Sequence, residues 1–278
     1  MAGHTEGTLA GAEGRNLYWQ AWEPEGALKG VVVVVHGLHE HSARYDWVAE
    51  QLNGAGYAVY ALDHSGHGRS DGVRGQLYRW SQVLDGVGSL VRKAREAHPD
   101  LPLFVLGHSM GGLVSLSYVI RDKPDIRGLI VSAPALVQTV AGPALIAAGK
   151  VLSVVAPNLG AVALDSEHVS RDPAIVEYHR TNPLMFTGKV RSRTAAEILK
   201  AADDVVANLG SLTVPLLVAS GTADKIVSPA GADLAYEKAG SADKTLKTYD
   251  GLYHEILNEP EKDVVMNDVL SWIAAHSA

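Results

Sequence analysis

Short apolar runs alternate along the chain with longer stretches in which apolar residues recur every three or four positions. Short, wholly apolar runs are typical of strands buried on both faces of a parallel sheet. We expect strands at residues 17–22, 31–35, 57–62, 103–106, 128–132, 214–220 and 245–249. The helical pattern covers residues 44–55, 80–97 and 110–121 and a closing helix that carries Val265, Val269, Trp272 and Ile273 on one face. This order predicts a mostly parallel sheet with helices on both faces.

One long interval breaks this alternation, because no convincing strand lies between residue 133 and about residue 207. It opens with residues 135–164, in which Lys150 is the only charge and prolines and glycines interrupt short helical patterns. An insertion into an α/β sheet at this point lies over the strand ends, where such sheets bind ligands. We therefore predict a core at residues 1–133, a helical cap at 134–206 and the rest of the core at 207–278.

The composition narrows the class of protein. The chain has 278 residues, of which 20% are charged and 47% apolar, and this suits one globular core. A net charge of −7 and the lack of a Lys/Arg cluster argue against a nucleic-acid partner. No cysteine is present, which excludes a thiolate nucleophile, a disulfide framework and a cysteine-ligated metal. The first residues lack the pattern of a secretory signal, and no run reaches the ~18 strongly apolar residues of a membrane span, so we expect a cytoplasmic protein.

The run GHSMG at residues 107–111 joins a predicted strand to a predicted helix. A Gly-x-Ser-x-Gly pattern in that context is a nucleophile elbow, a tight and strained turn that raises the serine side chain above the sheet edge. Such a turn leaves no room for side chains two residues before and two residues after the serine, and residues 107 and 111 are glycines. Ser109 is therefore the candidate nucleophile.

A serine hydroxyl needs a base to take its proton, and the base needs an acid that fixes its tautomer and stabilises its charged form. After an elbow of this kind, the acid and then the base follow the serine along the chain. Asp224 comes directly after the predicted strand 214–220, and His254 follows the predicted strand 245–249. Both therefore lie at the same sheet edge as Ser109 and are the candidate acid and base.

Other titratable residues fit these roles less well. Asp233 falls within a helical pattern, and Asp243 and Asp250 lie before and at the end of the strand that precedes the candidate base. His108 points away from the serine along the turn, so we expect it to support the elbow.

The oxyanion that develops during acyl transfer needs preorganised N–H donors. One candidate is the amide of Met110, which follows the serine and begins a helix whose dipole favours negative charge. The second is the amide of Leu38, in the loop after the strand at 31–35.

Seven motifs occur in the order found in a known family: HGLHEHSARY (36–45), LDHSGHGRSDG (62–72), GHSMGG (107–112), SRDP (170–173), TNPL (181–184), GTAD (221–224) and GLYHEILNEPE (251–261). By these the chain resembles the monoacylglycerol lipases of the α/β-hydrolase superfamily, the bacterial type in particular. The resemblance implies a mostly parallel eight-stranded sheet flanked by helices, with an inserted helical cap. It implies a catalytic triad of Ser109, Asp224 and His254, oxyanion donors at Leu38 and Met110, and hydrolysis of a single acyl chain from glycerol without a cofactor.

Three residues of the first motif are candidates for substrate contact. His39 stands where the relatives usually have a small residue, which would narrow the entrance to the oxyanion loop or alter the headgroup pocket. Glu40 and Arg44 either recognise the glycerol hydroxyls or form an ion pair that holds the loop. A metal site built on His36, His39 and His41 is a much weaker interpretation, because a strand ending in His-Gly is typical of an oxyanion loop.

The expected function is therefore that of a serine hydrolase acting on monoacylglycerols, at lipid aggregates or a membrane surface that the apolar cap would contact. A lysophospholipase or a broad carboxylesterase would use the same triad. A proline-type aminopeptidase would need acidic groups for a free amino terminus, and we identify no such cluster. A catalytically silent lipid-binding member of the fold is a remote alternative, because every triad position is filled. The oligomeric state and the preferred chain length stay open.

Overall fold

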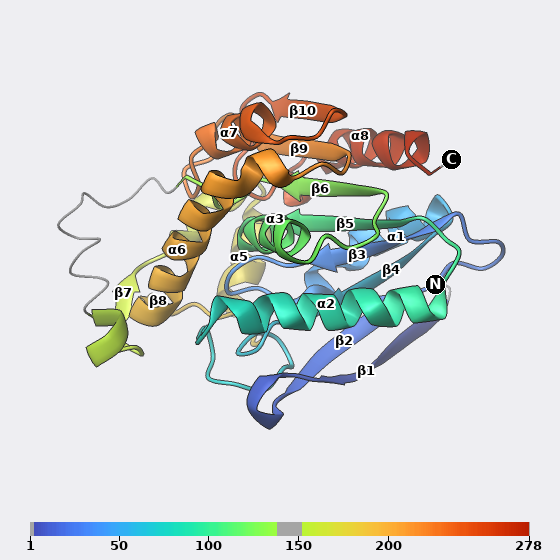
Figure 1. Ribbon diagram of the computed structural model, residues 1–278. Coiled ribbons are helices and arrows are strands. Elements are labelled where there is room, and N and C mark those ends of the chain that lie inside the picture. Colours follow the sequence, from blue (N-terminus) through green and yellow to red (C-terminus); the bar gives the residue numbers. More distant parts are fainter. Residues whose placement is uncertain (1–2, 138–151, 278) are drawn as a thin grey trace.

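An eight-stranded sheet forms the centre of the computed structural model, which describes residues 3–137 and 152–277 (Figure 1). Its strands are β1 (His4–Ala10), β2 (Asn16–Trp22), β3 (Gly30–Val35), β4 (Tyr57–Leu62), β5 (Leu103–His108), β6 (Gly128–Ser132), β9 (Leu216–Gly221) and β10 (Lys244–Tyr249). They lie in the order β1-β2-β4-β3-β5-β6-β9-β10. β1 and β2 run antiparallel to their neighbours, and β4 through β10 pair in parallel. The predicted parallel core is confirmed.

Helices cover both faces of this sheet. They are α1 (Asp46–Gly54), α2 (Trp80–Ala97), α3 (Met110–Asp122), α5 (Pro173–Thr181), α6 (Ser192–Asn208), α7 (Ala230–Lys238) and α8 (Lys262–Ala275). Buried residues of α2, α3, α6 and α7 join one hydrophobic cluster, and those of α1 and α8 join a second cluster on the opposite face. In Figure 1, α2 and α3 accordingly lie in front of the strands, with α1 and α8 beyond them.

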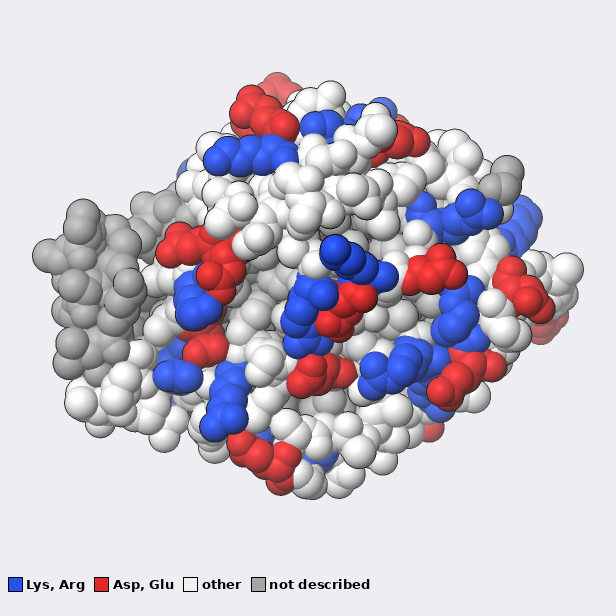
Figure 2. Space-filling model, viewed as in Figure 1, with Lys and Arg blue, Asp and Glu red and all other residues white. Residues whose placement is uncertain are grey.

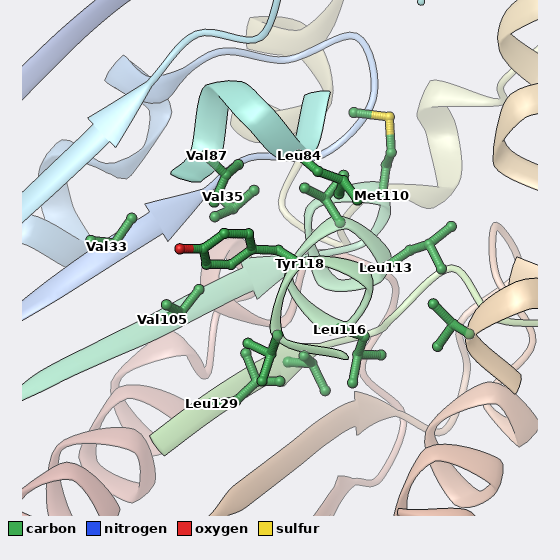
Figure 3. Packing of buried hydrophobic residues seen from close by; sticks show 14 of the residues in the cluster. Val33, Val35, Leu84, Val87, Val105, Met110, Leu113, Leu116, Tyr118 and Leu129 are labelled. Carbon is green, nitrogen blue, oxygen red and sulfur yellow. The ribbon is translucent and has the colours of Figure 1, made fainter. Parts of the chain in front are cut away.

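Side-chain alternation along β3 explains how one strand serves both clusters. Val31, Val33 and Val35 pack into the first cluster, whereas Val32 and Val34 pack into the second. Successive side chains of a strand point to opposite faces, so a strand buried on both sides must be apolar throughout. Figure 3 shows the first cluster, with side chains of α2 and α3 packed against valines of β3 and β5. This packing fixes the start of α3, and with it the turn that carries Ser109.

Two regions contain strands that the apolar pattern does not predict. β1 is an exposed edge strand with the sequence HTEGTLA, and its pairing with β2 rather than burial holds it in place. Within the interval expected to lack strands, β7 (Gly160–Val162) and β8 (Val190–Arg191) form a two-stranded antiparallel ribbon. That expectation is wrong for these residues, because strands of three and two residues are too short to carry a run of buried apolar side chains.

The segment between β6 and β9 holds the ribbon, α5 and α6, and part of the residues 135–164 that suggested a cap lies outside the described ranges. Figure 1 shows β7 and β8 at the far end of α6, away from the sheet. The other end of α6 packs into the first cluster through Ala201, Ala202 and Val205. On the face drawn in Figure 2, basic and acidic side chains are interspersed, so the net charge of −7 is not concentrated there.

Candidate active site

Ser109 lies in the sharp turn between β5 and α3. Its backbone angles of φ 56° and ψ −120° fall in a region that residues with a side chain rarely adopt. A Cβ atom on Gly107 would overlap the carbonyl oxygen of Gly111, and one on Gly111 would overlap the carbonyl oxygen of Val35. Only glycine fits at either side of this turn, as the elbow interpretation requires.

The candidate acid and base meet this serine from two other loops. His254, in the loop after β10, places Nε2 2.8 Å from Ser109 Oγ. Its Nδ1 lies 2.7 Å from Oδ2 of Asp224, in the loop after β9. The other carboxylate oxygen of Asp224 accepts hydrogen bonds from the amides of Ile226 and Val227 at 2.8 and 3.0 Å. The structure therefore brings all three predicted residues into one hydrogen-bonded chain.

Electrostatics suit an acid–base pair. Burial raises the pKa of Asp224, but the attraction of His254 and the hydrogen bonds to the carboxylate outweigh it and leave that pKa below its ordinary value. Burial lowers the pKa of His254, and the neighbouring Asp224 outweighs it, so the pKa of the imidazole is raised. The carboxylate stays charged and stabilises the imidazolium that forms when the ring takes a proton.

The two predicted oxyanion amides flank the serine. Val35 pairs with Gly107 in the sheet, so the loop that follows β3 runs beside the elbow. A Cβ atom built on Gly37 would lie 3.2 Å from Cβ of Ser109. In the described part of the chain, the amides of Leu38 and Met110 have no hydrogen-bond acceptor. Met110 begins α3, and the first amides of a helix lack partners within it.

The competing acids lie elsewhere. Asp233 is in the first turn of α7, Asp243 lies 2.9 Å from His276, and Asp250 accepts a hydrogen bond from Thr222. His108 lies below the elbow, where its ring packs 4.8 Å from that of His254 and Nδ1 lies 3.2 Å from Oγ of Ser132.

His39 is buried against the segment between α5 and β8. Its ring meets Phe186 edge-on at 4.7 Å, and the carbonyl of His39 accepts a hydrogen bond from the Phe186 amide. Nε2 of the ring has no partner within residues 3–137 and 152–277. Burial lowers the pKa of His39 to about 3, so the ring is neutral.

Glu40 and Arg44 are buried together. The Arg44 guanidinium lies 2.7 Å from Glu40 and 2.6 Å from Glu255, and the exposed fractions of the three side chains are 3%, 4% and 6%. Of the two interpretations of Glu40 and Arg44, this geometry favours the ion pair that holds the loop. The sequence did not predict the ion pair of Glu255 with Arg44 or the contact of Phe186 with His39.

The histidines next to the candidate site hold loops. Nε2 of His36 accepts a hydrogen bond from the amide of His64 at 3.0 Å, and the two rings lie 4.2 Å apart. Nδ1 of His67 lies 3.1 Å from the carbonyl of Ser65. Among the residues that the structure describes, no group of three or more His, Asp or Glu side chains is arranged to hold a metal.

Two of the later motifs bring residues 169–171 against the loop that carries His254. The amide of Glu255 donates to the carbonyl of Val169, and the hydroxyl of Ser170 donates to the carbonyl of Asn258. Arg171 lies 3.0 Å from Glu259. These contacts hold SRDP against the sequence that follows His254.

Comparison with known proteins agrees with this architecture. Residues 26–261 match the family described as serine aminopeptidase, S33. The chain belongs to this family. It is 39% identical over 273 residues to the monoacylglycerol lipase of Mycolicibacterium smegmatis, with 98% of each chain covered.

A further relative and a solved structure are also similar to this chain. The phospholipase YtpA of Bacillus subtilis is 36% identical, over 89% of this chain and 94% of its own. The crystal structure of a monoacylglycerol lipase from Paleococcus ferrophilus superposes with a TM-score of 0.84 at 31% identity, covering 94% of this chain and 99% of the other. These likenesses, together with the sheet topology, confirm the expected α/β-hydrolase fold. In the described residues, no helix is long and apolar enough to cross a membrane.

Proposed function

We propose that this protein is a serine hydrolase that cleaves monoacylglycerols to a fatty acid and glycerol. The observation that carries the proposal is the chain from Ser109 Oγ to His254 Nε2 at 2.8 Å and from His254 Nδ1 to Asp224 at 2.7 Å. Three groups in this geometry have the roles of nucleophile, base and orienting acid.

The proposed reaction proceeds in two steps. Ser109 attacks the ester carbonyl while His254 takes its proton, and the amides of Leu38 and Met110 stabilise the oxyanion. His254 then returns the proton to the departing glycerol oxygen, which leaves an acyl-enzyme. Water attacks that ester in turn while His254 takes its proton, and His254 passes this proton to Ser109 Oγ as the fatty acid departs. Asp224 remains ionised throughout and stabilises each imidazolium.

The choice of substrate rests on similarity over the whole chain. A relative at 39% identity and a structural neighbour at 31% are both monoacylglycerol lipases. A second candidate, a lysophospholipase, is supported by the 36% identity to a phospholipase. The two differ in the leaving group, since glycerol is neutral and a glycerophosphate ester is charged. Comparing rates on a monoacylglycerol and on lysophosphatidylcholine of the same acyl chain distinguishes them.

We also propose that residues 134–206 act as a cap that contacts lipid. Val154 and Val155 are 72% and 71% exposed, and the nearby Leu159 is 51% exposed. Large apolar side chains gathered at one exposed place are typical of a binding surface. A cap face of this kind would bring the enzyme to aggregates of its poorly soluble substrate.

Replacing Ser109 tests the proposed chemistry. We expect Ser109→Ala to lower kcat on a monoacylglycerol at least about 10⁴-fold, because the remaining groups cannot form an acyl-enzyme. The variant should also lose labelling by a fluorophosphonate probe, while its circular dichroism spectrum and melting temperature stay close to those of the wild type. Ser89→Ala, a half-buried serine on α2, is the matched control and should keep full activity. Wild-type protein that neither reacts with the probe nor hydrolyses esters would indicate a lipid-binding protein instead.

A further inference from the structure

Arg44 lies at the centre of a buried cluster that the proposed reaction does not use directly. Its guanidinium donates to Glu40 at 2.7 Å and makes two parallel hydrogen bonds to Glu255 at 2.8 and 2.6 Å. We call Glu40, Arg44 and Glu255 the Arg44 cluster. Two parallel bonds between a guanidinium and a carboxylate fix orientation as well as distance.

One arm of the cluster reaches the loop at residues 36–41, which we call the oxyanion loop. Glu40 Oε1 accepts a hydrogen bond from the amide of Gly37, the residue before the proposed donor Leu38, and a second one from the hydroxyl of Tyr45 at 3.0 Å. The carboxylate of Glu40 therefore holds the backbone at the point where the Leu38 amide must be aimed.

The other arm reaches the loop at residues 250–258, which we call the base loop. Glu255 directly follows His254, and its carboxylate accepts from Asn258 Nδ2 at 2.9 Å in addition to Arg44. Arg44 thus bridges the two loops that supply one proposed oxyanion donor and the proposed base. The loops belong to distant parts of the sequence, and no sheet hydrogen bond joins β3 to β10.

The charges of the cluster do not cancel. Burial raises the pKa of Glu40, but the attraction of Arg44 outweighs it and brings that pKa to about 2. For Glu255, burial raises the pKa, but the attraction of Arg44 outweighs burial and leaves the pKa lowered. For Arg44, burial lowers the pKa, but the attraction of the two carboxylates outweighs burial and leaves the pKa raised. Two carboxylates and one guanidinium leave one surplus negative charge, in a place where water screens it little.

We propose that Arg44 is a positioning residue, which holds the oxyanion loop through Glu40 and the base loop through Glu255, and that the surplus charge of its cluster stabilises the imidazolium of His254. The inference rests on the proposed serine hydrolase function. It gives the imidazolium of His254 a second stabilising negative charge besides that of Asp224. The charged or titratable groups near the imidazole are then Asp224 after β9, His108 on β5, and the cluster itself.

This role is distinct from recognition of glycerol hydroxyls by Arg44. A side chain that is 3% exposed and already bonded to two carboxylates has few donors left for a substrate. The two roles differ in what they predict for an ester without glycerol. A positioning role affects every ester alike, whereas glycerol recognition affects monoacylglycerols alone.

Glu255→Gln is the decisive variant, because it keeps the shape of the side chain and leaves Arg44 paired with Glu40. We measure kcat and KM on 1-decanoylglycerol and on p-nitrophenyl decanoate, which share an acyl chain. We expect kcat to fall by about tenfold to hundredfold on both esters with little change in KM, a smaller loss than removing an oxyanion donor itself. Arg44→Lys keeps the charge but not the two parallel bonds, and should show a partial loss of the same kind.

The pH profile separates positioning from general loosening. His254 must be neutral to act as a base, so the acid limb of kcat/KM follows its titration. Removing a negative charge makes the imidazolium less stable, and we expect the acid limb of Glu255→Gln to move to lower pH by roughly 0.5–1 unit. The control is Glu197→Gln on α6, which loses an ion pair with Arg193 but can still accept a hydrogen bond from the amide of Trp80, and it should leave the limb in place.

Three results would overturn the proposal: a loss confined to 1-decanoylglycerol through a raised KM, an acid limb that does not move, or full activity of Glu255→Gln. If Glu255→Gln fails to fold, Arg44→Lys tests the positioning role through kcat and KM on the two esters, and Glu40→Gln, which also removes one negative charge from the cluster, tests the acid limb. Wild-type protein that hydrolyses p-nitrophenyl decanoate but not 1-decanoylglycerol would contradict the proposed substrate, and the role of the Arg44 cluster would still be tested on the nitrophenyl ester.

Discussion

His39 combines two features that are costly for a single residue. Its φ of 67° lies in the left-handed region that favours glycine, and its imidazole is 1% exposed. Nε2 has no partner in the ranges that the structure describes, although a buried polar atom without a partner is unfavourable. Structural costs of this kind often accompany function. Because the ring packs against Phe186 and belongs to the loop that holds the proposed Leu38 donor, we expect it to limit the room for the polar end of a substrate.

Replacing His39 with glycine tests this role in choosing the headgroup. Glycine readily adopts the φ of 67° at this position. The variant lacks the imidazole that packs against Phe186, so space opens beside the oxyanion loop. We expect kcat/KM for lysophosphatidylcholine relative to that for the matching monoacylglycerol to rise by about tenfold, a typical size for a change in pocket volume. Phe186→Ala removes the other half of the contact and should act in the same direction. An unchanged ratio in both variants would assign His39 to loop packing alone.

The catalytic roles of single residues could be predicted from the sequence where they depend on the order of strands and loops along the chain. Ser109, Asp224 and His254 each follow a strand, and parallel strands bring their carboxyl ends to one edge. The role of Glu255 could not be predicted in this way, because its partner Arg44 lies 211 residues away and depends on how two loops close. The same limit applies to Phe186, whose contact with His39 exists only once the segment after α5 folds back.

At the level of elements, the apolar pattern predicts a strand only where both faces are buried. The six residues of β3 and of β4 are all buried, and both strands were expected. β1 is exposed or half-buried at every position, so its sequence does not differ from that of a loop. The ribbon of β7 and β8 was not predicted because its strands are only three and two residues long. Edge and surface strands depend on backbone pairing, which leaves little trace in side-chain type.

The apolar cap surface permits a test at this scale. We expect the double change Val154→Asp and Val155→Asp to weaken binding to vesicles that contain monoacylglycerol by about tenfold. Burial of these two side chains in lipid would contribute roughly 1.5 kcal/mol to the free energy of binding, and losing it lowers the affinity by that factor. Hydrolysis of a dispersed short-chain ester should change little, because the triad is untouched. Sedimentation with vesicles and rates on both substrates measure this.

Val264→Asp is the matched control for this test. Val264 is 58% exposed and lies on α8, a helix that Figure 1 shows on the opposite side of the molecule from the ribbon of β7 and β8. If this change weakened vesicle binding as much as the changes in the cap, general charge repulsion rather than the cap would explain the effect.

For the molecule as a whole, the distribution of histidine matters. The chain has 12 histidines, and eight of those in the described residues are buried: His36, His39, His41, His64, His67, His108, His179 and His254. Burial lowers the pKa of seven of them, to about 3 for His39 and to about 4 for His67 and His108. His254, whose pKa is raised, is the exception. The sequence shows the number of histidines, but only the fold shows that most of them must remain neutral.

This burial predicts that the protein loses stability in mild acid. Between the ordinary histidine pKa of about 6.5 and the lower pKa of the folded state, the unfolded chain binds more protons than the folded chain, so the free energy of unfolding falls as pH falls. Each such histidine contributes up to about 1.4 kcal/mol per pH unit in that window. The raised pKa of His254 has the opposite effect on stability and offsets the contribution of one of these histidines. We expect a loss of at least roughly 3 kcal/mol between pH 7.5 and pH 5.5, a large part of the 5–15 kcal/mol typical of a domain.

Urea unfolding at the two pH values, at fixed ionic strength, measures this loss, and His67→Gln shows whether buried histidines cause it. Glutamine can still donate to the carbonyl of Ser65, as Nδ1 of His67 does, but it binds no proton. The variant should therefore be less stable than the wild type at pH 7.5 by whatever its poorer packing costs, yet lose about 1.3 kcal/mol less between pH 7.5 and pH 5.5. His4→Gln changes an exposed histidine of β1 and should leave the pH-dependent loss as it is. If His67→Gln lost as much stability as the wild type over this range, His67 would not be a source of the acid sensitivity. Carboxylates such as Glu40 and Glu255 would not explain the loss either, because their lowered pKa values place their effect at lower pH.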